Sequence, residues 1–504
     1  MRAHRPISKV VVVGGGTAGW IAAAALSKLL GKAVSVELVE SDAIGTVGVG
    51  EATIPQIRRL NAILGIDERA FVAATSGSFK LGIEFNDWGR VGESYLHTFG
   101  DAGIDLQGIP FHHYFLRRHM GEQGSSLWDY SLHHKAAYAN KFGMVERVGR
   151  TSMTGLAYAY HFDAGLYARY LREVSEARGV VRTEGEGVDV ELDAESGHGA
   201  AVRLASDARV EGELFIDCTG FRALLIGEAL GVPYQDWSGW LPCNRAVAVP
   251  CERTDPLLPY TKASAREAGW QWRIPLQHRT GNGHVFCDSF TTVERATDVL
   301  MENLDAPATA EPKVLRFTTG RRERLWEKNV VSLGLASGFL EPLESTSIHI
   351  IQSNVSKLVE LFPDTGFGAA NMAEYNRVVT KEYDLIRDFL ILHYARTDRE
   401  DTAFWRHCKH MSVPDSLTHK LELFREGGRL FHDPDDLFRE SSWVQVMMGQ
   451  GVEPRGWHRH VDQLSDEQLS GFLGDVKTLI RRTVEPLPQH ASFVREHCLS
   501  ELAD

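Results

Sequence analysis

The clearest fold signal is the stretch "KVVVVGGGTAGWIAAAALSKLL", residues 9–30. Its valine run is typical of a strand that is buried on both faces of a parallel sheet. Glycines follow, and then an alanine-rich segment with the composition of a helix. Residues 34–41, "VSVELVES", have the β-branched character of a second strand. The sequence therefore predicts a βαβ unit near the start of the chain.

The glycines of this unit are spaced for phosphate binding. Gly14, Gly16 and Gly19 form GxGxxG between the expected strand and helix, where the backbone can approach a pyrophosphate at a helix N-terminus. Glu40 ends the second strand about 20 residues later, where a carboxylate can accept ribose hydroxyls. The combination predicts a dinucleotide site. A tight turn with packing glycines remains the alternative reading of the motif alone.

The remaining chain shows three kinds of pattern. Residues 210–221 and 329–342 resemble further buried strands that end in glycine loops. Residues 184–212 and 243–256 alternate apolar and polar side chains, as antiparallel strands do. After about residue 370 the apolar spacing becomes helical.

These patterns predict an α/β fold with a Rossmann-type module. We expect this module over residues 1–375, with an antiparallel substrate-side sheet inserted at about 235–320. Residues 376–504 are expected to form a mostly helical part that covers the substrate.

Composition excludes several classes of protein. The 504 residues carry 54 basic and 67 acidic side chains, a formal charge of −13, which argues against a nucleic-acid partner. The six cysteines form no CxxC pair, so we expect no metal site and the reduced thiols of a cytoplasmic protein. No apolar run reaches about 18 residues, so no membrane span is expected, and the start lacks a cleavable signal pattern.

Four further motifs are open to two interpretations when taken singly. "GTVGVGEATIP" (45–55) is a flexible loop that, beside a dinucleotide fold, suits a segment along a flavin. "SFKLG" (78–82) contains Lys80, which by itself reads as a surface lysine. "GFLEPLEST" (338–346) contains Glu344, which by itself reads as the acidic start of a helix. "WQWRIP" (270–275) places two tryptophans on one face of a strand.

Taken in order, GGGTAGW, GVGEATIP, SFKLG, WxWxIP and GFLEPLEST resemble the motifs of the flavin-dependent tryptophan halogenase family. The motifs span roughly residues 10–350 and the length agrees over the whole chain. The resemblance implies an FAD-binding fold like that of flavoprotein monooxygenases, with FAD used as FADH2 and a halide ion as cofactors. It also implies that hypohalous acid formed at the flavin halogenates an indole or other electron-rich aromatic in a separate pocket.

The resemblance assigns roles to particular residues. The catalytic pair matches Lys80 and Glu344, and the halide site matches Thr346 and Ser347. His113 and Phe115 are expected to sandwich the flat ring of the substrate, which Trp443 and Gln450 also contact. The motif's tryptophans, which in the family disfavour monooxygenase chemistry, match Trp270 and Trp272, and Ile274 and Pro275 complete the motif. The expected cofactor contacts are Gly14, Gly16, Thr17, Ala18, Gly19, Glu40, Gly50, Glu51, Ala52 and Leu335.

Two departures from the family pattern bear on specificity. Ser347 stands where the family usually has glycine; because serine resists positive φ, we expect a looser halide site that uses bromide in preference to chloride. Gln450 replaces a carboxylate that would bind an amino-acid ammonium, so we expect plain indole to be favoured over tryptophan.

No second nucleotide motif is visible in the sequence. The family receives reduced flavin from a separate reductase, so the resemblance implies a separate NADH-dependent flavin reductase as partner. The oligomeric state is left open, with a homodimer among the states considered. Two alternatives to the halogenase remain: a flavin-dependent aromatic hydroxylase, and an FAD-binding protein without catalysis.

Overall fold

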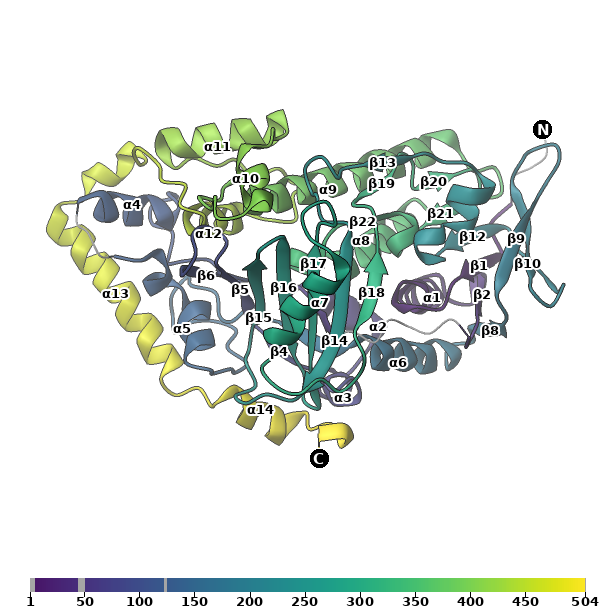
Figure 1. The fold of residues 1–504 in the computed structure, drawn as a ribbon, viewed down its shortest axis with the longest axis horizontal. Helices are drawn as coiled ribbons and strands as arrows, with labels where there is room; N and C mark the ends of the chain where they lie inside the picture. Colours follow the sequence, from purple (N-terminus) through teal and green to yellow (C-terminus); the bar gives the residue numbers. More distant parts are fainter. Residues whose placement is uncertain (1–4, 44–49, 122–124, 504) are drawn as a thin grey trace. The chain divides into compact units, whose positions relative to one another are not determined.

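The computed structural model describes residues 5–43, 50–121 and 125–503 (Figure 1). The chain groups into two compact units. Unit 1 comprises Met1–Thr75, Phe162–Pro242 and Phe317–Asp384, and unit 2 comprises Ser76–His161, Cys243–Arg316 and Leu385–Asp504. The boundary near residue 375 that the sequence suggested stays a prediction.

Unit 1 is built on a six-stranded sheet in the order β20-β21-β12-β1-β2-β8. The central strand β1 (Lys9–Val13) pairs in parallel with both β12 and β2, which confirms the βαβ unit. Its residues Val10, Val11 and Val12 are completely buried, as their apolar run predicts. The other strands are β2 (Ser35–Glu40), β8 (Val181–Glu184), β12 (Leu214–Asp217), β20 (Trp326–Glu327) and β21 (Val330–Ser332).

Helix α1 (Thr17–Leu30) follows β1 and packs against α6 (Ala164–Glu176) and α8 (Ser347–Glu360), as Figure 1 shows. Its alanines Ala22, Ala23 and Ala24 are fully buried, which allows the close approach of these helices. The unit also contains α2 (Ile57–Leu64), α3 (Glu68–Ala74) and β3 (Gly50–Ala52). One small sheet is formed by β9 (Gly187–Leu192), β10 (Gly199–Leu204) and β11 (Arg209–Glu211). A second small sheet is formed by β13 (Tyr234–Asp236), β19 (Gly320–Arg322) and β22 (Gly338–Phe339).

Unit 2 is built on a seven-stranded, mostly antiparallel sheet in the order β18-β14-β17-β16-β15-β5-β6. Its strands are β14 (Arg245–Glu252), β15 (Thr261–Arg266), β16 (Gly269–Pro275), β17 (Arg279–Phe286), β18 (Lys313–Arg316), β5 (Gly82–Asn86) and β6 (Ser94–Thr98). The first five fall in the predicted range of about 235–320. The hairpin β5–β6 joins them from much earlier in the chain, because β5 pairs in parallel with β15.

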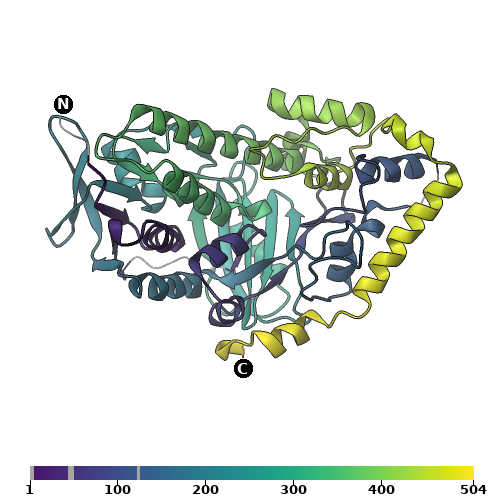
Figure 2. The same cartoon turned by 180° about the vertical axis from the view of Figure 1, so that it is seen from behind.

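Helices cover this sheet and make up most of the C-terminal part, as predicted. The long helix α13 (Asp466–Val484) packs against α4 (Phe111–Gly121) and α5 (Leu132–Tyr138), as Figure 2 shows. The other helices are α7 (Val293–Glu302), α9 (Ala369–Ala395, which continues from unit 1), α10 (Ala403–His410), α11 (Asp415–Gly427), α12 (Glu440–Gly449) and α14 (His490–His497).

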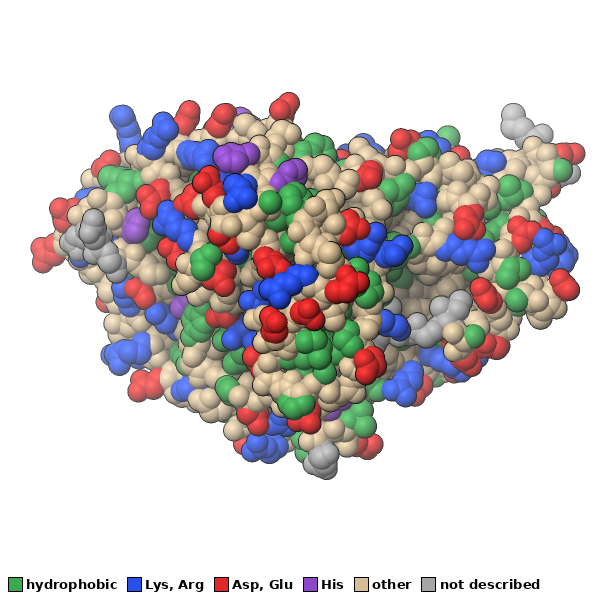
Figure 3. All heavy atoms as spheres, viewed as in Figure 1, with side chains coloured by type: hydrophobic (Ala, Val, Ile, Leu, Met, Phe, Trp, Pro, Cys, Tyr) green, Lys and Arg blue, Asp and Glu red, His purple; other side chains and the backbone are tan. Residues whose placement is uncertain are grey.

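Acidic and basic side chains are interspersed over the face shown in Figure 3. Among the described helices, none has both the length and the apolar character that crossing a membrane requires.

Candidate functional site

The glycine loop between β1 and α1 has the geometry that the dinucleotide motif predicts. Gly14 has φ of 107°, and a Cβ there would lie 2.2 Å from the carbonyl oxygen of Cys218. At Gly19 a Cβ would lie 1.8 Å from the carbonyl oxygen of Gly14. Gly16 caps α1 without a side-chain hydrogen bond, and no atom lies within 4 Å of its Cβ position. The backbone N–H groups of this helix end are therefore accessible to a phosphate.

Glu40 lies against this loop. A Cβ on Gly15 would overlap the Glu40 carboxylate, and the carboxylate accepts hydrogen bonds from Trp20 Nε1 at 3.2 Å and Arg182 Nε at 2.5 Å. The acid expected to take ribose hydroxyls is thus beside the phosphate loop and held by two donors. This donor and acceptor set fits the adenosine half of FAD.

The loop that carries Leu335 lies against the start of α1 in unit 1, so two segments expected to contact FAD are neighbours. Gly334, at φ of 62°, packs against Ala18 on α1, where a Cβ at Gly334 would lie 2.7 Å from the Ala18 Cβ. The next residue, Leu335, is 40% exposed although it is apolar, as a residue that covers a flat ring would be. Burial raises the pKa of Glu51 on β3 to about 7. Part of the second glycine-rich motif, residues 45–49, lies outside the described residues.

The segment after Leu335 carries Glu344 and the expected halide residues. Glu344 is buried at the end of the short 3-10 turn Pro342–Glu344. Ser345 is left-handed, with φ of 59°, and α8 begins at Ser347. The premise that the position of Ser347 requires positive φ is not met, because Ser347 opens a right-handed helix and Ser345 has the left-handed conformation.

The N-terminus of α8 has the features of an anion site. Thr346 is its N-cap residue, yet its side chain makes no cap hydrogen bond. Among the described residues, the fully buried Thr346 Oγ1 has no hydrogen-bond partner. An uncapped helix end with an orphaned hydroxyl fits a bound halide, which would accept from these groups.

Lys80 is fully buried on β4 (Ser78–Lys80) in unit 2. Its ammonium lies over the ring of Phe99, with Nζ 5.2 Å from the ring centre. The neighbouring Phe79 points to the other face of the strand and stacks on Phe142, with ring centres 4.3 Å apart. Its backbone N–H also donates to His490 Nε2 at 3.1 Å. The surface-lysine reading is therefore wrong, because β4 is anchored on one face so that Lys80 is held on the other.

A neutral histidine lies near this ammonium. Burial, and then the charge of Lys80, lower the pKa of His161 well below its usual value. His161 Nδ1 lies 3.0 Å from Ser78 Oγ and its Nε2 lies 2.9 Å from Thr261 Oγ1. Ser78 Oγ also donates to the carbonyl oxygen of Pro275 at 2.9 Å, so β4 is tied to the end of the WxWxIP strand.

The two tryptophans of that strand lie on one buried face of β16. Trp270 and Trp272 have ring centres 6.2 Å apart, and Trp270 lies 6.3 Å from Trp88. The Trp272 ring covers Gly283 on β17, where a Cβ would lie 2.1 Å from it. Ile274 and Pro275 continue the buried strand. The motif thus builds a rigid aromatic wall.

His113 and Phe115 do not form the sandwich that the sequence analysis expects. Both lie on helix α4, where residues two positions apart point in different directions. His113 Nδ1 accepts from the backbone N–H of His458 at 3.2 Å, and Phe115 stacks on His119 at 5.2 Å. The physical reason for the error is the helical backbone, since a strand would have placed both on one face.

Trp443 and Gln450 are buried in and just after α12. Trp443 Nε1 donates to Asp436 Oδ2 at 3.1 Å, and the Lys420 ammonium lies 3.7 Å from its ring centre. Gln450 Nε2 donates to the carbonyl oxygen of His393 at 2.6 Å, while its Oε1 has no partner among the described residues. Gln450 therefore offers a neutral acceptor and no carboxylate.

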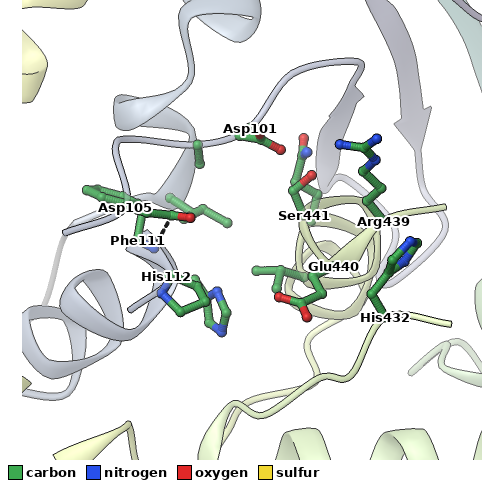
Figure 4. Close-up of a pocket in the computed structure, with 13 residues that line it drawn as sticks. Asp101, Asp105, Phe111, His112, His432, Arg439, Glu440 and Ser441 are labelled. Carbon is green, nitrogen blue, oxygen red and sulfur yellow. Dashed lines mark hydrogen bonds between the residues drawn. The ribbon is translucent and has the colours of Figure 1, made fainter. Parts of the chain in front are cut away.

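A cavity of about 500 Å³ lies beside the N-terminus of α12 (Figure 4). Gln445 in its wall accepts from the backbone N–H of Thr98 at 2.9 Å and donates to the carbonyl oxygen of Gly100 at 3.2 Å. These two residues flank Phe99, so the cavity borders the segment that carries the ring under Lys80. The lining is Asp101, Ala102, Asp105, Pro110, Phe111, His112, Leu127, His432, Arg439, Glu440, Ser441, Val444 and Gln445.

This cavity has an acidic lining. Asp101, Asp105 and Glu440 face one cation, Arg439, and no ion pair of these four residues occurs within the described parts of the chain. Burial raises the pKa of Glu440; the neighbouring His432 lowers this pKa and the charge of Asp105 raises it, so that the net direction is upward. Burial lowers the pKa of His112 to about 4, so this wall residue is neutral at pH 7. Neither Phe99 nor these carboxylates stands in one of the motifs that mark the site in the sequence.

Comparison with known proteins gives consistent matches over the whole chain. The family model described as tryptophan halogenase matches residues 9–466. The chain is 37% identical to tryptophan 6-halogenase SttH of Streptomyces toxytricini over 83% of this chain and 84% of that protein. It is 33% identical to tryptophan 7-halogenase RebH of Lentzea aerocolonigenes over 97% and 98% of the two chains.

Solved structures agree with these relatives. Xcc4156, a flavin-dependent halogenase from Xanthomonas campestris, superposes with a TM-score of 0.95 at 50% identity, covering 98% of this chain and 99% of that one. BrvH, a flavin-dependent halogenase from Brevundimonas sp. BAL3, superposes with a TM-score of 0.93 at 40% identity, covering 97% and 99%. The family and the fold expected from the motifs are confirmed.

Proposed function

Because the chain belongs to the tryptophan halogenase family, we propose that it is a flavin-dependent halogenase of indole or a related electron-rich aromatic. FAD, as FADH2, and a halide ion are the cofactors of this family. Reduced flavin and O2 supply the oxidising power that converts halide into hypohalous acid. The observation that carries the proposal is the buried Lys80, whose ammonium lies over the ring of Phe99.

The proposed role of Lys80 is to activate hypohalous acid. A buried ammonium that donates a hydrogen bond to the oxygen of this acid favours the departure of hydroxide as the ring attacks the halogen. Neutral His161 supports this role, because it adds no second positive charge beside the ammonium. The anchoring of Phe79 on the opposite face limits the freedom of the lysine backbone.

The proposed role of Glu344 is to complete the substitution. A carboxylate stabilises the cationic arenium and can accept its proton when aromaticity is restored. Glu344 is almost fully buried and precedes the uncapped end of α8, where Thr346 and Ser347 are proposed to bind the halide. The proposed FAD contacts are the loop around Gly14 and Gly16, the Glu40 carboxylate, and Leu335.

The tryptophan wall argues against the hydroxylase alternative. Trp270 and Trp272 are 1% and 8% exposed, so they are packed residues and not movable gates. The resemblance gives these two tryptophans the role of disfavouring a direct approach of the substrate to the flavin, and their tight packing supports that role. An FAD-binding protein without catalysis would have no need for a buried lysine, whose desolvation is costly.

We propose that the substrate is a neutral or cationic aromatic and that bromide is used in preference to chloride. The acidic lining of the cavity repels carboxylates, and Gln450 offers no charge to an amino-acid ammonium. Bromide sheds its hydration shell more readily than chloride and is easier to oxidise, and these properties do not depend on the conformation of Ser347.

FADH2 is proposed to come from a separate NADH-dependent flavin reductase. We also propose a cytoplasmic location. It is supported by the six free cysteines, Cys218, Cys243, Cys251, Cys287, Cys408 and Cys498, which are all buried and unbridged.

The proposal is tested by incubating the protein with FAD, a flavin reductase, NADH and a panel of aromatics, with and without bromide. Masses shifted by one halogen, seen only with halide, support the halogenase. Hydroxylated products would favour the monooxygenase, and an absence of turnover for every aromatic would favour the non-catalytic flavoprotein.

A further inference from the structure

Glu382 on α9 is a buried carboxylate, 6% exposed, to which no role is assigned above. Its Oε1 accepts from His349 Nε2 at 2.9 Å, and its Oε2 accepts from Ser353 Oγ at 2.9 Å and from Lys357 Nζ at 2.6 Å. Burial alone would raise the pKa of Glu382, but the interactions with His349 and then Lys357 lower it to about 2. Glu382 is therefore an ionised carboxylate with three donors.

All three donors come from one face of α8. Residues 349, 353 and 357 are four positions apart, so their side chains form one stripe along the helix. His349 is the third residue of α8 and Ser347 is the first. The Glu382 carboxylate thus fixes α8 along its length, including the turn that begins at the proposed halide residues.

The next residue of α9 holds a second functional segment. Ser337 Oγ donates to the carbonyl oxygen of Gly334 at 2.7 Å and lies 2.8 Å from the Tyr383 hydroxyl. Since the serine proton is used toward Gly334, the tyrosine hydroxyl donates to Ser337 Oγ. This pair closes the loop that presents Leu335. Glu382 and Tyr383 therefore anchor the proposed halide helix and the proposed flavin loop from one turn of α9.

We propose that Glu382 is a positioning residue for halide binding, which it achieves by anchoring the first turn of α8 through His349. The inference rests on the proposed function, in which Thr346 and Ser347 bind the halide. An anion at a helix N-terminus is held by backbone N–H groups, and their directions depend on the orientation of the first turn. A looser first turn weakens halide binding before it affects the aromatic substrate.

The test compares Glu382→Gln with the matched control Glu374→Gln. Glu374 lies on the same helix but is exposed, and its one ion pair among the described residues is with Arg377, three positions away. Glutamine keeps the shape of Glu382 but turns an N–H2 group toward part of its donor set. In Glu382→Gln we expect KM for bromide to rise by about tenfold, with kcat at saturating bromide and KM for indole within about twofold of wild type. In the control Glu374→Gln, KM for bromide, kcat and KM for indole should all equal the wild-type values.

A readout without turnover separates this inference from the proposed function. Bromide should raise the Tm of the FAD-loaded wild type, and Glu382→Gln should need about tenfold more bromide for the same rise. If the wild type forms no halogenated product yet shows this difference, the proposed function fails and the positioning role stands. An unchanged bromide dependence of both KM and Tm would overturn the positioning role.

Ser353→Ala is a milder variant that removes only one donor. We expect about a threefold rise in KM for bromide, with a CD spectrum like that of the wild type. Ser353→Ala is the deciding variant if Glu382→Gln does not fold. In that case, an unchanged KM for bromide in Ser353→Ala would overturn the positioning role of Glu382.

Discussion

The ammonium of Lys80, at the end of β4, lies 5.2 Å from the centre of the ring of Phe99, which directly follows β6. The β5–β6 hairpin explains the meeting. Gly82 pairs with Thr98 across it, and the backbone N–H of Phe99 donates to the carbonyl oxygen of Leu81 at 3.1 Å. Residue 99 is therefore placed beside residue 81, next to the lysine.

Phe99→Ala should lower kcat for bromination of indole by about tenfold, which corresponds to the loss of about 1.4 kcal/mol from a cation–ring contact and ring packing. FAD binding should be unchanged. Initial rates by chromatography and flavin fluorescence check both expectations. Phe431→Ala is the matched control, because that phenylalanine is 72% exposed in the same unit. Equal rates for Phe99→Ala and wild type would remove Phe99 from the site.

Phe115→Ala should act on stability and not on catalysis. Phe115 is 1% exposed and packs beside Tyr130 and His119, so truncation leaves a cavity that costs about 3–5 kcal/mol. Urea denaturation measures the loss. In the fraction that remains folded, KM for indole should stay within about twofold of wild type. A selective rise in this KM without destabilisation would restore the substrate role first expected of Phe115.

Indole should be halogenated faster than tryptophan. The carboxylate of tryptophan would be repelled by the charges of Asp101, Asp105 and Glu440, whereas plain indole carries no such charge; Gln450 offers only a neutral acceptor in place of the carboxylate that the family uses to bind the amino-acid ammonium. An unpaired buried charge costs more than a neutral hydrogen bond. Comparison of kcat/KM for the two substrates checks this expectation. A higher kcat/KM for tryptophan would show that its amino-acid group has a partner elsewhere.

Bromide should give more product than chloride when both are present at equal concentration, because bromide loses its water more readily. Mass spectrometry of the indole products gives the ratio directly. Ser347→Gly should leave this ratio within about twofold, since Ser347 has a helical conformation that glycine does not improve. Excess chlorinated product, or a large gain of chlorination in Ser347→Gly, would contradict this prediction.

The elements whose structure depends on residues close in sequence could be predicted from local sequence patterns. The strand β1, the glycine loop and the helix α1 follow one another within residues 9–30 in the predicted order, because burial and backbone freedom are local properties. The WxWxIP strand was likewise predicted as a strand with both indoles on one face. The addition of the β5–β6 hairpin to the inserted sheet depends on parallel pairing with β15, which no local pattern encodes.

The site was predictable only in part, for the same reason. Lys80 and Glu344 stand in distinctive motifs, whereas Phe99 follows an ordinary strand and becomes notable only through the hairpin register. Once Gly82 is known to pair with Thr98 in the β5–β6 hairpin, Phe99 follows as the residue opposite Leu81, next to Lys80. His113 and Phe115 were matched to the substrate pocket through the family resemblance, but both lie on helix α4, where residues two positions apart cannot face one ring together. Glu382 meets His349 from 33 residues away, and helix packing sets that contact.

The central claim is that Lys80 and Glu344 act on the aromatic after the flavin has reacted with oxygen. The most direct test is the amount of bromoindole formed per FADH2 oxidised by wild type, Lys80→Ala and Glu344→Gln. We predict a brominated mass from the wild type, a loss of at least about 100-fold in Lys80→Ala and a sharp fall in Glu344→Gln, with FAD bound equally in all three. Undiminished bromination by Lys80→Ala, or loss of FAD binding in either variant, would contradict the claim.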